Sequence, residues 1–121
     1  MITKQAILIL AHQDTLVLRS LIKQLDSEYF DIFIHFDLKN RSQKVEDGLK
    51  NLTDKSRLYL IPSVEVVWGD FSVVEAELLL MEAAVDVAEY SYFHLLSGQD
   101  LALKSAAQIY NFFNSSTENF F

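Results

Sequence analysis

Stretches of strand length with a continuous apolar character alternate along the chain with stretches of amphipathic helical character. The clearest strand-like runs cover residues 6–11, 31–37 and 90–96, and the first of them contains no polar residue. A strand without polar positions is typical of a sheet that is covered on both faces. Alternation of such strands with helices favours a mainly parallel sheet between two helical layers. The sequence therefore predicts an α/β fold with three layers (α/β/α), formed as a single domain over residues 1–121.

Four amphipathic stretches predict helices between and after these strands. Asp14 or Thr15 is expected to cap the first helix, and Ser42 precedes the second. Residues 72–75 and 105–108 both have the capping-box pattern that marks the start of a helix. The apolar side chains expected to face the core are Leu18, Leu21, Ile22 and Leu25 in the first helix, Val45, Leu49 and Leu52 in the second, Val74, Leu78, Met81 and Val85 in the third, and Ile109, Phe112 and Phe113 in the fourth.

Pro62 is the single proline of the chain, and it separates two extended stretches at residues 57–61 and 64–67. Proline cannot donate a hydrogen bond to a sheet, so the two stretches are not expected to form one continuous strand. We expect one of them to be a central strand and the other to be a connection along the edge of the sheet.

The chain carries a formal net charge of −7, which argues against a nucleic-acid partner because no basic patch is present to neutralise phosphates. Cysteine is absent, so disulfides and thiolate zinc sites are excluded and a reducing compartment is favoured. The first residues lack the apolar segment of a signal peptide. Residues 78–87 are rich in apolar side chains, but Glu82 and Asp86 interrupt them and the stretch is too short to span a bilayer. We expect a soluble protein.

The last residues, Asn119, Phe120 and Phe121, look like the beginning of a strand that follows a polar turn. Two exposed phenylalanines would be an unusual natural terminus, because large exposed apolar groups favour association. We therefore expect residues 1–121 to be the N-terminal part of a longer protein, with further site residues outside the chain.

Right-handed crossovers between parallel strands place the carboxyl ends of those strands at one edge of the sheet, where open α/β folds bind ligands. Four segments that end or follow the expected strands carry small or polar residues, and we expect them to meet at this edge. The candidate binding residues are Ala11, His12, Asp37, Val67, Trp68, Gly69, Ser97, Gly98, Gln99 and Asp100.

Several of these candidates also have a structural interpretation. Asp37 can hydrogen-bond a ribose or a base edge, or it can cap a helix. Trp68 can stack on a base or sugar while the following glycine permits close backbone approach, or it can seal the edge of the core. Ser97 and Gly98 suit a tight turn whose backbone N–H groups hold phosphate or sugar hydroxyls. Asp100 can bind the same ligand or only brace the turn.

The three histidines do not predict a metal site. His35 and His94 lie inside strands, where a histidine is more often a hydrogen-bonded core residue than a ligand. His12 lies at the end of a strand and is the one histidine that we expect near a substrate.

Other familiar chemistries have no support in the chain. The motifs of P-loop nucleotide-binding proteins, of classical dinucleotide-binding folds and of serine hydrolases are absent. A phosphoacceptor receiver domain would carry acidic residues just after its first strand, and Asp14 alone is a poor match. A non-catalytic α/β module, which binds a nucleotide or a partner protein at the same edge, remains an alternative to an enzyme.

Several segments, in this order, resemble the core-2/I-branching glycosyltransferase family, which includes β-1,6-N-acetylglucosaminyltransferases and peptide xylosyltransferases. The matching segments are Ala6-Ile-Leu-Ile-Leu-Ala-His12, Ile32-Phe-Ile-His-Phe-Asp37, Val67-Trp-Gly-Asp-Phe-Ser72 and Phe93-His-Leu-Leu-Ser-Gly-Gln-Asp100, which runs on into Leu103-Lys-Ser105. Each segment alone is short, but their order and spacing over nearly the whole chain make the resemblance specific.

The resemblance implies a GT-A-like (Rossmann-like) domain that binds a UDP-sugar donor, with UDP-N-acetylglucosamine expected, and transfers the sugar with inversion to a glycan hydroxyl. It implies no metal cofactor, and no D-x-D motif occurs in the chain. By position, Ala11, His12 and Asp37 would line the uridine pocket, residues 67–69 would flank the nucleotide, and residues 97–100 would border the sugar and the acceptor. The family carries a proline where this chain has Ala102, a departure that loosens the expected turn.

The resemblance also implies that the catalytic base and the basic residues that hold the diphosphate follow Phe121. Inversion needs a base for the acceptor hydroxyl and positive charge for the departing UDP. We therefore expect residues 1–121 to supply the donor-binding half of a transferase and to be inactive alone. The absence of cysteine favours a bacterial cytoplasmic protein, because a eukaryotic secretory relative would more often carry disulfides. The Golgi lumen is the expected location if the source is eukaryotic, and any membrane association is expected through parts outside this chain.

Overall fold

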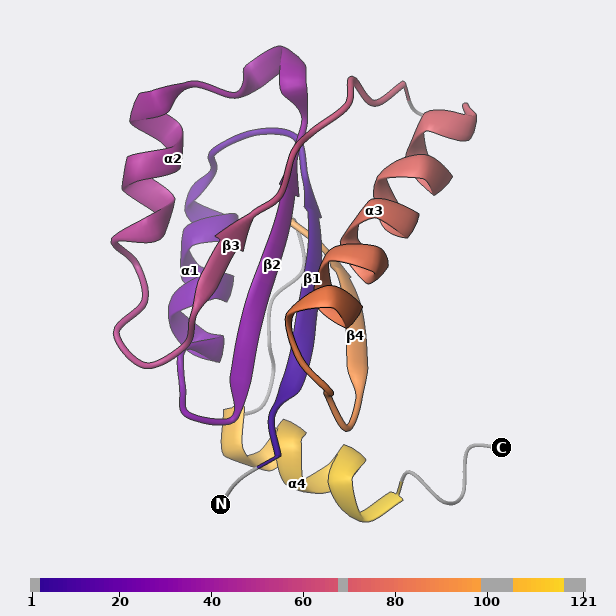
Figure 1. The fold of residues 1–121 in the computed structure, drawn as a ribbon. Helices are drawn as coiled ribbons and strands as arrows, with labels where there is room; N and C mark the ends of the chain where they lie inside the picture. The colour runs from indigo at the N-terminus through magenta and orange to yellow at the C-terminus, as the bar shows by residue number, and fades with distance from the viewer. Residues whose placement is uncertain (1–2, 68–69, 99–105, 117–121) are drawn as a thin grey trace.

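The computed structural model describes residues 3–67, 70–98 and 106–116, with the backbone alone for residues 112–116. Four parallel strands form one sheet in the order β3-β2-β1-β4 (Figure 1). The elements in chain order are β1 (Gln5–Ala11), α1 (Leu16–Leu25), β2 (Phe30–Phe36), the 3-10 helix η1 (Leu38–Asn40), α2 (Gln43–Lys50), β3 (Leu58–Leu60), α3 (Phe71–Val87), β4 (Phe93–Ser97) and α4 (Ala106–Ser116). The predicted α/β fold with a parallel sheet is confirmed.

The helices form layers on both faces of the sheet. Helices α1 and α2 lie on one face, α3 lies on the other, and α4 lies across the amino ends of the strands (Figure 1). Two apolar clusters follow this division. The larger joins β1 and β2 to α1, α2 and α4, and the smaller joins the sheet to α3. The two central strands are therefore buried on both sides, as their apolar sequences predict.

The first two helices begin where the sequence predicts. The hydroxyl of Thr15 accepts a hydrogen bond from the N–H of Leu18 at 3.1 Å, and Ser42 caps α2 in the same way through Val45. Such caps satisfy N–H groups that have no partner within the helix. The predicted inward side chains of α1 are all buried. Of the predicted stripe of α2, Leu49 is buried and the other two side chains are partly buried against the same cluster.

The predictions for the third helix are wrong in two respects. Asp70 caps α3, whereas the hydroxyl of Ser72 accepts a hydrogen bond from the N–H of Val67 at 2.8 Å. The buried side chains of α3 are Ala76, Leu80 and Ala84, whereas the predicted inward residues Val74, Leu78, Met81 and Val85 are exposed. Apolar residues surround most of this helix, so its periodicity does not identify one face. Two alanines on the buried face allow a close approach to the sheet.

The expectation of a central strand beside Pro62 is also wrong. Strand β3 contains three residues and lies outside β2, at one end of the strand order. Residues 61–67 continue from it without forming a strand in the described part of the chain. The N–H of Ile61 makes the last ladder bond, to the carbonyl of Ile34, and Pro62 follows it at the end of this outermost strand, a position where sheets tolerate proline.

Buried polar groups tie the amino ends of the strands together. The ring Nε2 of His94 lies 2.8 Å from the side-chain oxygen of Gln5, whose amide nitrogen donates to the carbonyl of Tyr110 in α4 at 3.0 Å. The interpretation of His94 as a hydrogen-bonded core residue is confirmed. Among the described helices, none combines the length and the apolar composition that crossing a membrane requires.

The fourth helix agrees with the prediction as far as it is described. Helix α4 begins at Ala106, and Ile109 packs against the larger cluster. Ser105, the side chains of Phe112 and Phe113, and the expected strand at residues 119–121 lie outside the described residues, as does Ala102.

Candidate functional site

The carboxyl ends of β1, β2 and β4 are joined at one edge of the sheet. The N–H of Asp37 donates to the carbonyl of Ala11 at 2.9 Å, and the N–H of Gly98 donates to the carbonyl of Leu10 at 2.9 Å. Strand β1 therefore lies between the other two at this edge, as its central place in the strand order requires. Three of the predicted site residues, Ala11, Asp37 and Gly98, meet there, and the edge lies at the top of Figure 1.

His12 follows β1 directly and is half-buried. Its carbonyl accepts a hydrogen bond from the side-chain amide of Asn40 at 2.7 Å. This bond links the residue after β1 to the 3-10 helix that follows β2. The structure thus places His12 beside the segment of Asp37, in agreement with the shared edge predicted from the sequence.

Asp37 is 2% exposed, and its side chain has several partners within the protein. One carboxylate oxygen accepts hydrogen bonds from the N–H of Lys39 at 3.1 Å and from the N–H of Val66 at 3.4 Å. The ammonium group of Lys39 lies 3.5 Å from the other oxygen. Asp37 therefore caps η1, as one of its two interpretations anticipated, and it also connects β2 to the segment after β3.

The remaining candidates are described only in part. Val67 is exposed, and its backbone N–H is held by Ser72 at the start of α3. Ser97 is exposed at the end of β4. Trp68, Gly69, Gln99 and Asp100 lie outside the described residues, so their proposed contacts with a ligand stay predictions.

A hollow with a volume of about 220 Å³ lies between the carboxyl end of β4 and the first turns of α3. Leu10, Leu95 and Leu96 provide apolar walls, and Ser97 provides a hydroxyl group. Val73 and Glu77 complete the lining from α3, and neither was among the predicted site residues. The four-residue spacing of Val73 and Glu77 places them on one face of the helix, but the sequence does not show that this face borders β4.

The model of the Core-2/I-Branching enzyme family matches residues 6–121. The chain belongs to this family. No curated protein sequence matches the chain. The family match covers all the segments that carry the resemblance in the sequence, and it includes each of the strand ends described above. Membership in this glycosyltransferase family places the function of the chain in sugar transfer.

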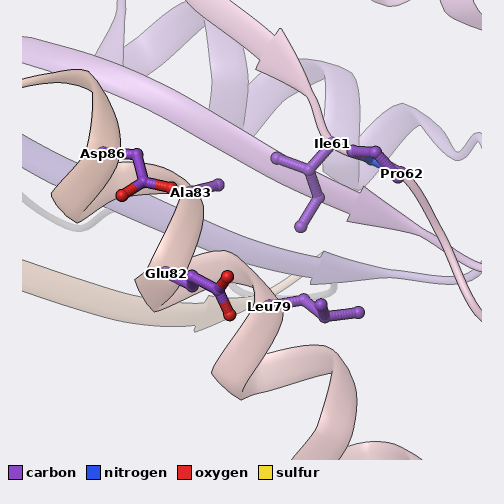
Figure 2. A pocket seen from close by; sticks show the side chains of 6 residues that line it. All are labelled: Ile61, Pro62, Leu79, Glu82, Ala83 and Asp86. Carbon is purple, nitrogen blue, oxygen red and sulfur yellow. The ribbon is translucent and has the colours of Figure 1, made fainter.

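A second hollow of this branching-enzyme chain lies on the opposite flank of α3 and has a volume of about 290 Å³. Figure 2 shows its lining, in which Glu82 and Asp86 lie on α3 with two apolar residues of that helix, and Ile61 and Pro62 lie on the segment that follows β3. None of the predicted site residues lines this second hollow. We therefore centre the candidate site on the joined strand ends, although the second hollow is the larger of the two.

Within the described ranges of this branching-enzyme chain, no group of three or more acidic or histidine side chains is arranged to hold a metal ion. His35 points from β2 toward the segment after β3, and burial lowers the pKa of its ring below the ordinary 6.5. Its side chain therefore serves as a neutral hydrogen-bonding group at neutral pH. This agrees with the expectation that the histidines inside strands belong to the core.

Proposed function

We propose that this chain binds the UDP-sugar donor of a glycosyltransferase at the joined carboxyl ends of β1, β2 and β4. The proposed reaction is an inverting transfer, without a metal cofactor, to a hydroxyl group of a glycan acceptor. Membership in the Core-2/I-Branching enzyme family supports sugar transfer as the class of reaction. The family resemblance makes UDP-N-acetylglucosamine the donor that we favour.

The observation that carries this proposal is the junction between β1 and β2. The N–H of Asp37 is bonded to the carbonyl of Ala11, so the carboxyl ends of these two strands lie side by side. In open α/β sheets, nucleotides bind outside the carboxyl ends of neighbouring strands. Ser97 and Glu77 line a hollow at the end of the next strand, where hydroxyl groups of a sugar would find hydrogen-bonding partners.

We assign donor binding to this chain, and we assign no catalytic base to the described residues. An inverting transfer requires a base for the acceptor hydroxyl and positive charge for the leaving diphosphate. The formal net charge of the chain is −7, which supports a partner other than nucleic acid and leaves the diphosphate charge to be stabilised by other groups.

Calorimetric titration with UDP, with ADP as the comparison nucleotide, tests the proposal. We expect wild type to bind UDP in preference to ADP, and Asp37→Ala to abolish this binding. Asp37→Asn keeps one oxygen acceptor and checks whether charge is required. Asp47→Ala is the control, because Asp47 is exposed on α2 and its carboxylate accepts a hydrogen bond only from Gln43 of the same helix among the described contacts. Equal affinity of wild type and Asp37→Ala for UDP would contradict the proposal.

The burial of Asp37 favours a second candidate, a non-catalytic α/β module that binds a nucleotide or a partner protein. Its carboxylate has partners within the protein, so its presence is explained without a ligand. Donor-hydrolysis assays separate the two functions, because a transferase site releases UDP from a UDP-sugar and a simple binding module does not. UDP binding without donor hydrolysis or transfer in any longer form of the protein would favour the module.

A further inference from the structure

Residues 61–67, which we call the rim segment, pass from β3 over the end of β2 toward the start of α3 (Figure 1). The last ladder bond of this region runs from the N–H of Ile61 to the carbonyl of Ile34 at 3.0 Å. Beyond it the segment forms no strand, so its polar backbone groups need other partners. One of them, the carbonyl of Val64, accepts a bond from the N–H of Leu38 at 3.3 Å.

Side chains from the end of β2 and from the residues that follow it take the place of the missing ladder hydrogen bonds. The ring Nε2 of His35 accepts a hydrogen bond from the N–H of Val64 at 3.1 Å. The carboxylate of Asp37 accepts a bond from the N–H of Val66 at 3.4 Å. The ammonium group of Lys39 donates to the carbonyl of Val66 at 2.8 Å. His35, Asp37 and Lys39, which are spaced two positions apart, thus each bond to the rim segment.

Arg41 completes the series. Its guanidinium group donates to the carbonyl of Ile61 and to the hydroxyl of Ser63, and it forms an ion pair of 3.1 Å with Glu46 of α2. Four side chains, at positions 35, 37, 39 and 41, therefore bond to a segment that lies about 20–30 positions further along the chain. This arrangement exists only in the folded protein.

His35 is the member of the series whose role is most specific. Its side chain is fully buried, at 0% exposure. Because Nε2 accepts the N–H of Val64, the proton of the neutral ring lies on Nδ1, and Nδ1 has no hydrogen-bond partner in the described part of the chain. A buried donor without a partner is costly, so packing alone would favour an apolar residue at this position. The bond to Val64 is the contribution that offsets this cost.

We propose that His35 is a positioning residue that holds the rim segment against the end of β2 and thereby shapes the nucleotide-binding edge. The proposal rests on the proposed function for its effect on the ligand. The N–H of Val66, two positions after Val64, bonds to the carboxylate of Asp37 at the carboxyl end of β2. Holding the N–H of Val64 therefore also holds the part of the rim segment that contacts Asp37.

Three substitutions separate this role from simple core packing. His35→Gln places an amide oxygen at about the reach of Nε2 and should retain the bond. His35→Asn keeps a polar amide that is one methylene too short, and His35→Phe keeps a ring without an acceptor. The control is His94→Gln, which alters the other buried strand histidine. The partner of His94 is Gln5, which lies at the amino end of β1, away from the candidate site.

The first measurement is amide hydrogen exchange by NMR. We expect His35→Asn and His35→Phe to speed exchange at Val64 and Val66 by about tenfold or more, the effect of losing roughly one hydrogen bond. Exchange in β1 should be unchanged, and His35→Gln and His94→Gln should leave Val64 protected. The proposal is overturned if the N–H of Val64 stays as protected as in wild type in His35→Asn or in His35→Phe, whichever of the two folds.

The second measurement is UDP affinity in the same variants. We expect His35→Asn and His35→Phe to weaken binding by about tenfold, with His35→Gln within about threefold of wild type. Faster exchange at Val64 with unchanged UDP affinity would show that the rim segment does not shape the site, which overturns the positioning role. Absence of UDP binding in wild type would instead contradict the proposed function, and the exchange result alone would then decide whether His35 holds the segment.

Discussion

Gly98 and Ala11 lie so close together that a Cβ atom on Gly98 would be 3.0 Å from the Cβ of Ala11 and 3.3 Å from its Cα. Ala11 belongs to a central strand and is buried, so its backbone has no room to move away. Glycine is therefore required at position 98 by the space beside β1 and not by an unusual backbone conformation. Gly98 and Ala11, both predicted site residues, are therefore in contact directly after the end of β4.

Gly98→Ala is expected to destabilise the protein by about 1–3 kcal/mol, the usual cost of overpacking a buried contact. Urea denaturation measures this change, and adding Ala11→Gly should recover part of it, because the two sites share one contact. The control is Gly48→Ala in α2, where the new Cβ meets only the flexible end of Arg19. A stabilising change of about 0.5–1 kcal/mol is expected there, because alanine is the better helix former.

The corrected orientation of α3 leads to a second prediction. Leu80 is 0% exposed and Leu78 is 57% exposed, although the apolar stripe predicted to face the core includes Leu78 and not Leu80. Leu80→Ala should cost about 2–5 kcal/mol in the free energy of unfolding because it opens a cavity. Leu78→Ala should stay within about 0.5 kcal/mol of wild type. Equal losses in chemical denaturation would show that both faces are buried.

His94 makes the stability of the fold depend on pH. Burial lowers the pKa of its ring from 6.5 to about 4, so the unfolded chain takes up a proton before the folded one does. Stability is therefore expected to fall as pH decreases from about 6.5 toward 4, by at most about 1.4 kcal/mol per pH unit for this group. Urea denaturation at several pH values measures the slope.

His94→Gln should reduce this slope without abolishing it, because burial also lowers the pKa of His35. An NMR titration of the folded wild-type protein should find the His94 ring neutral at pH 6. A midpoint near the ordinary value would contradict the burial seen here.

Asp26 joins the end of α1 to the loop before β3. Its carboxylate accepts hydrogen bonds from the N–H groups of Asp54, Lys55 and Ser56, at 2.9, 2.9 and 2.8 Å. Burial alone would raise its pKa, but these backbone bonds outweigh that effect and hold the pKa below 3.8. Asp26→Ala should therefore destabilise the protein by about 1–3 kcal/mol at pH 7.

The pH dependence provides the check. A carboxyl group with a lowered pKa stabilises the fold above its unfolded pKa, and this contribution is lost as pH falls through the folded value. The difference between wild type and Asp26→Ala in thermal or urea denaturation should thus shrink below about pH 4. Asp26→Asn, which keeps one oxygen acceptor, should lie between the two at pH 7.

Local patterns were sufficient to predict much of this protein. The continuous apolar run of β1 and the mostly apolar run of β2 predict buried strands, and both faces of each strand are covered in the structure. The sequence offers Asp14 or Thr15 as the first cap and Ser42 as the second, and Thr15 and Ser42 are the caps in the structure, because a cap depends on residues two or three positions away. The shared edge of Ala11, Asp37 and Gly98 followed from the topology of a parallel sheet, which leaves little choice of where the strands end.

The tertiary structure decided what depends on contacts between distant residues. The buried face of α3 could not be predicted, because the helix is apolar around most of its surface and only the sheet selects Leu80 over Leu78. The bond between His35 and Val64 joins residues 29 positions apart, and no spacing in the sequence indicates it. Sequence periodicity reports how a segment can be buried, whereas the choice of partner depends on the close approach of surfaces that only the folded chain brings together.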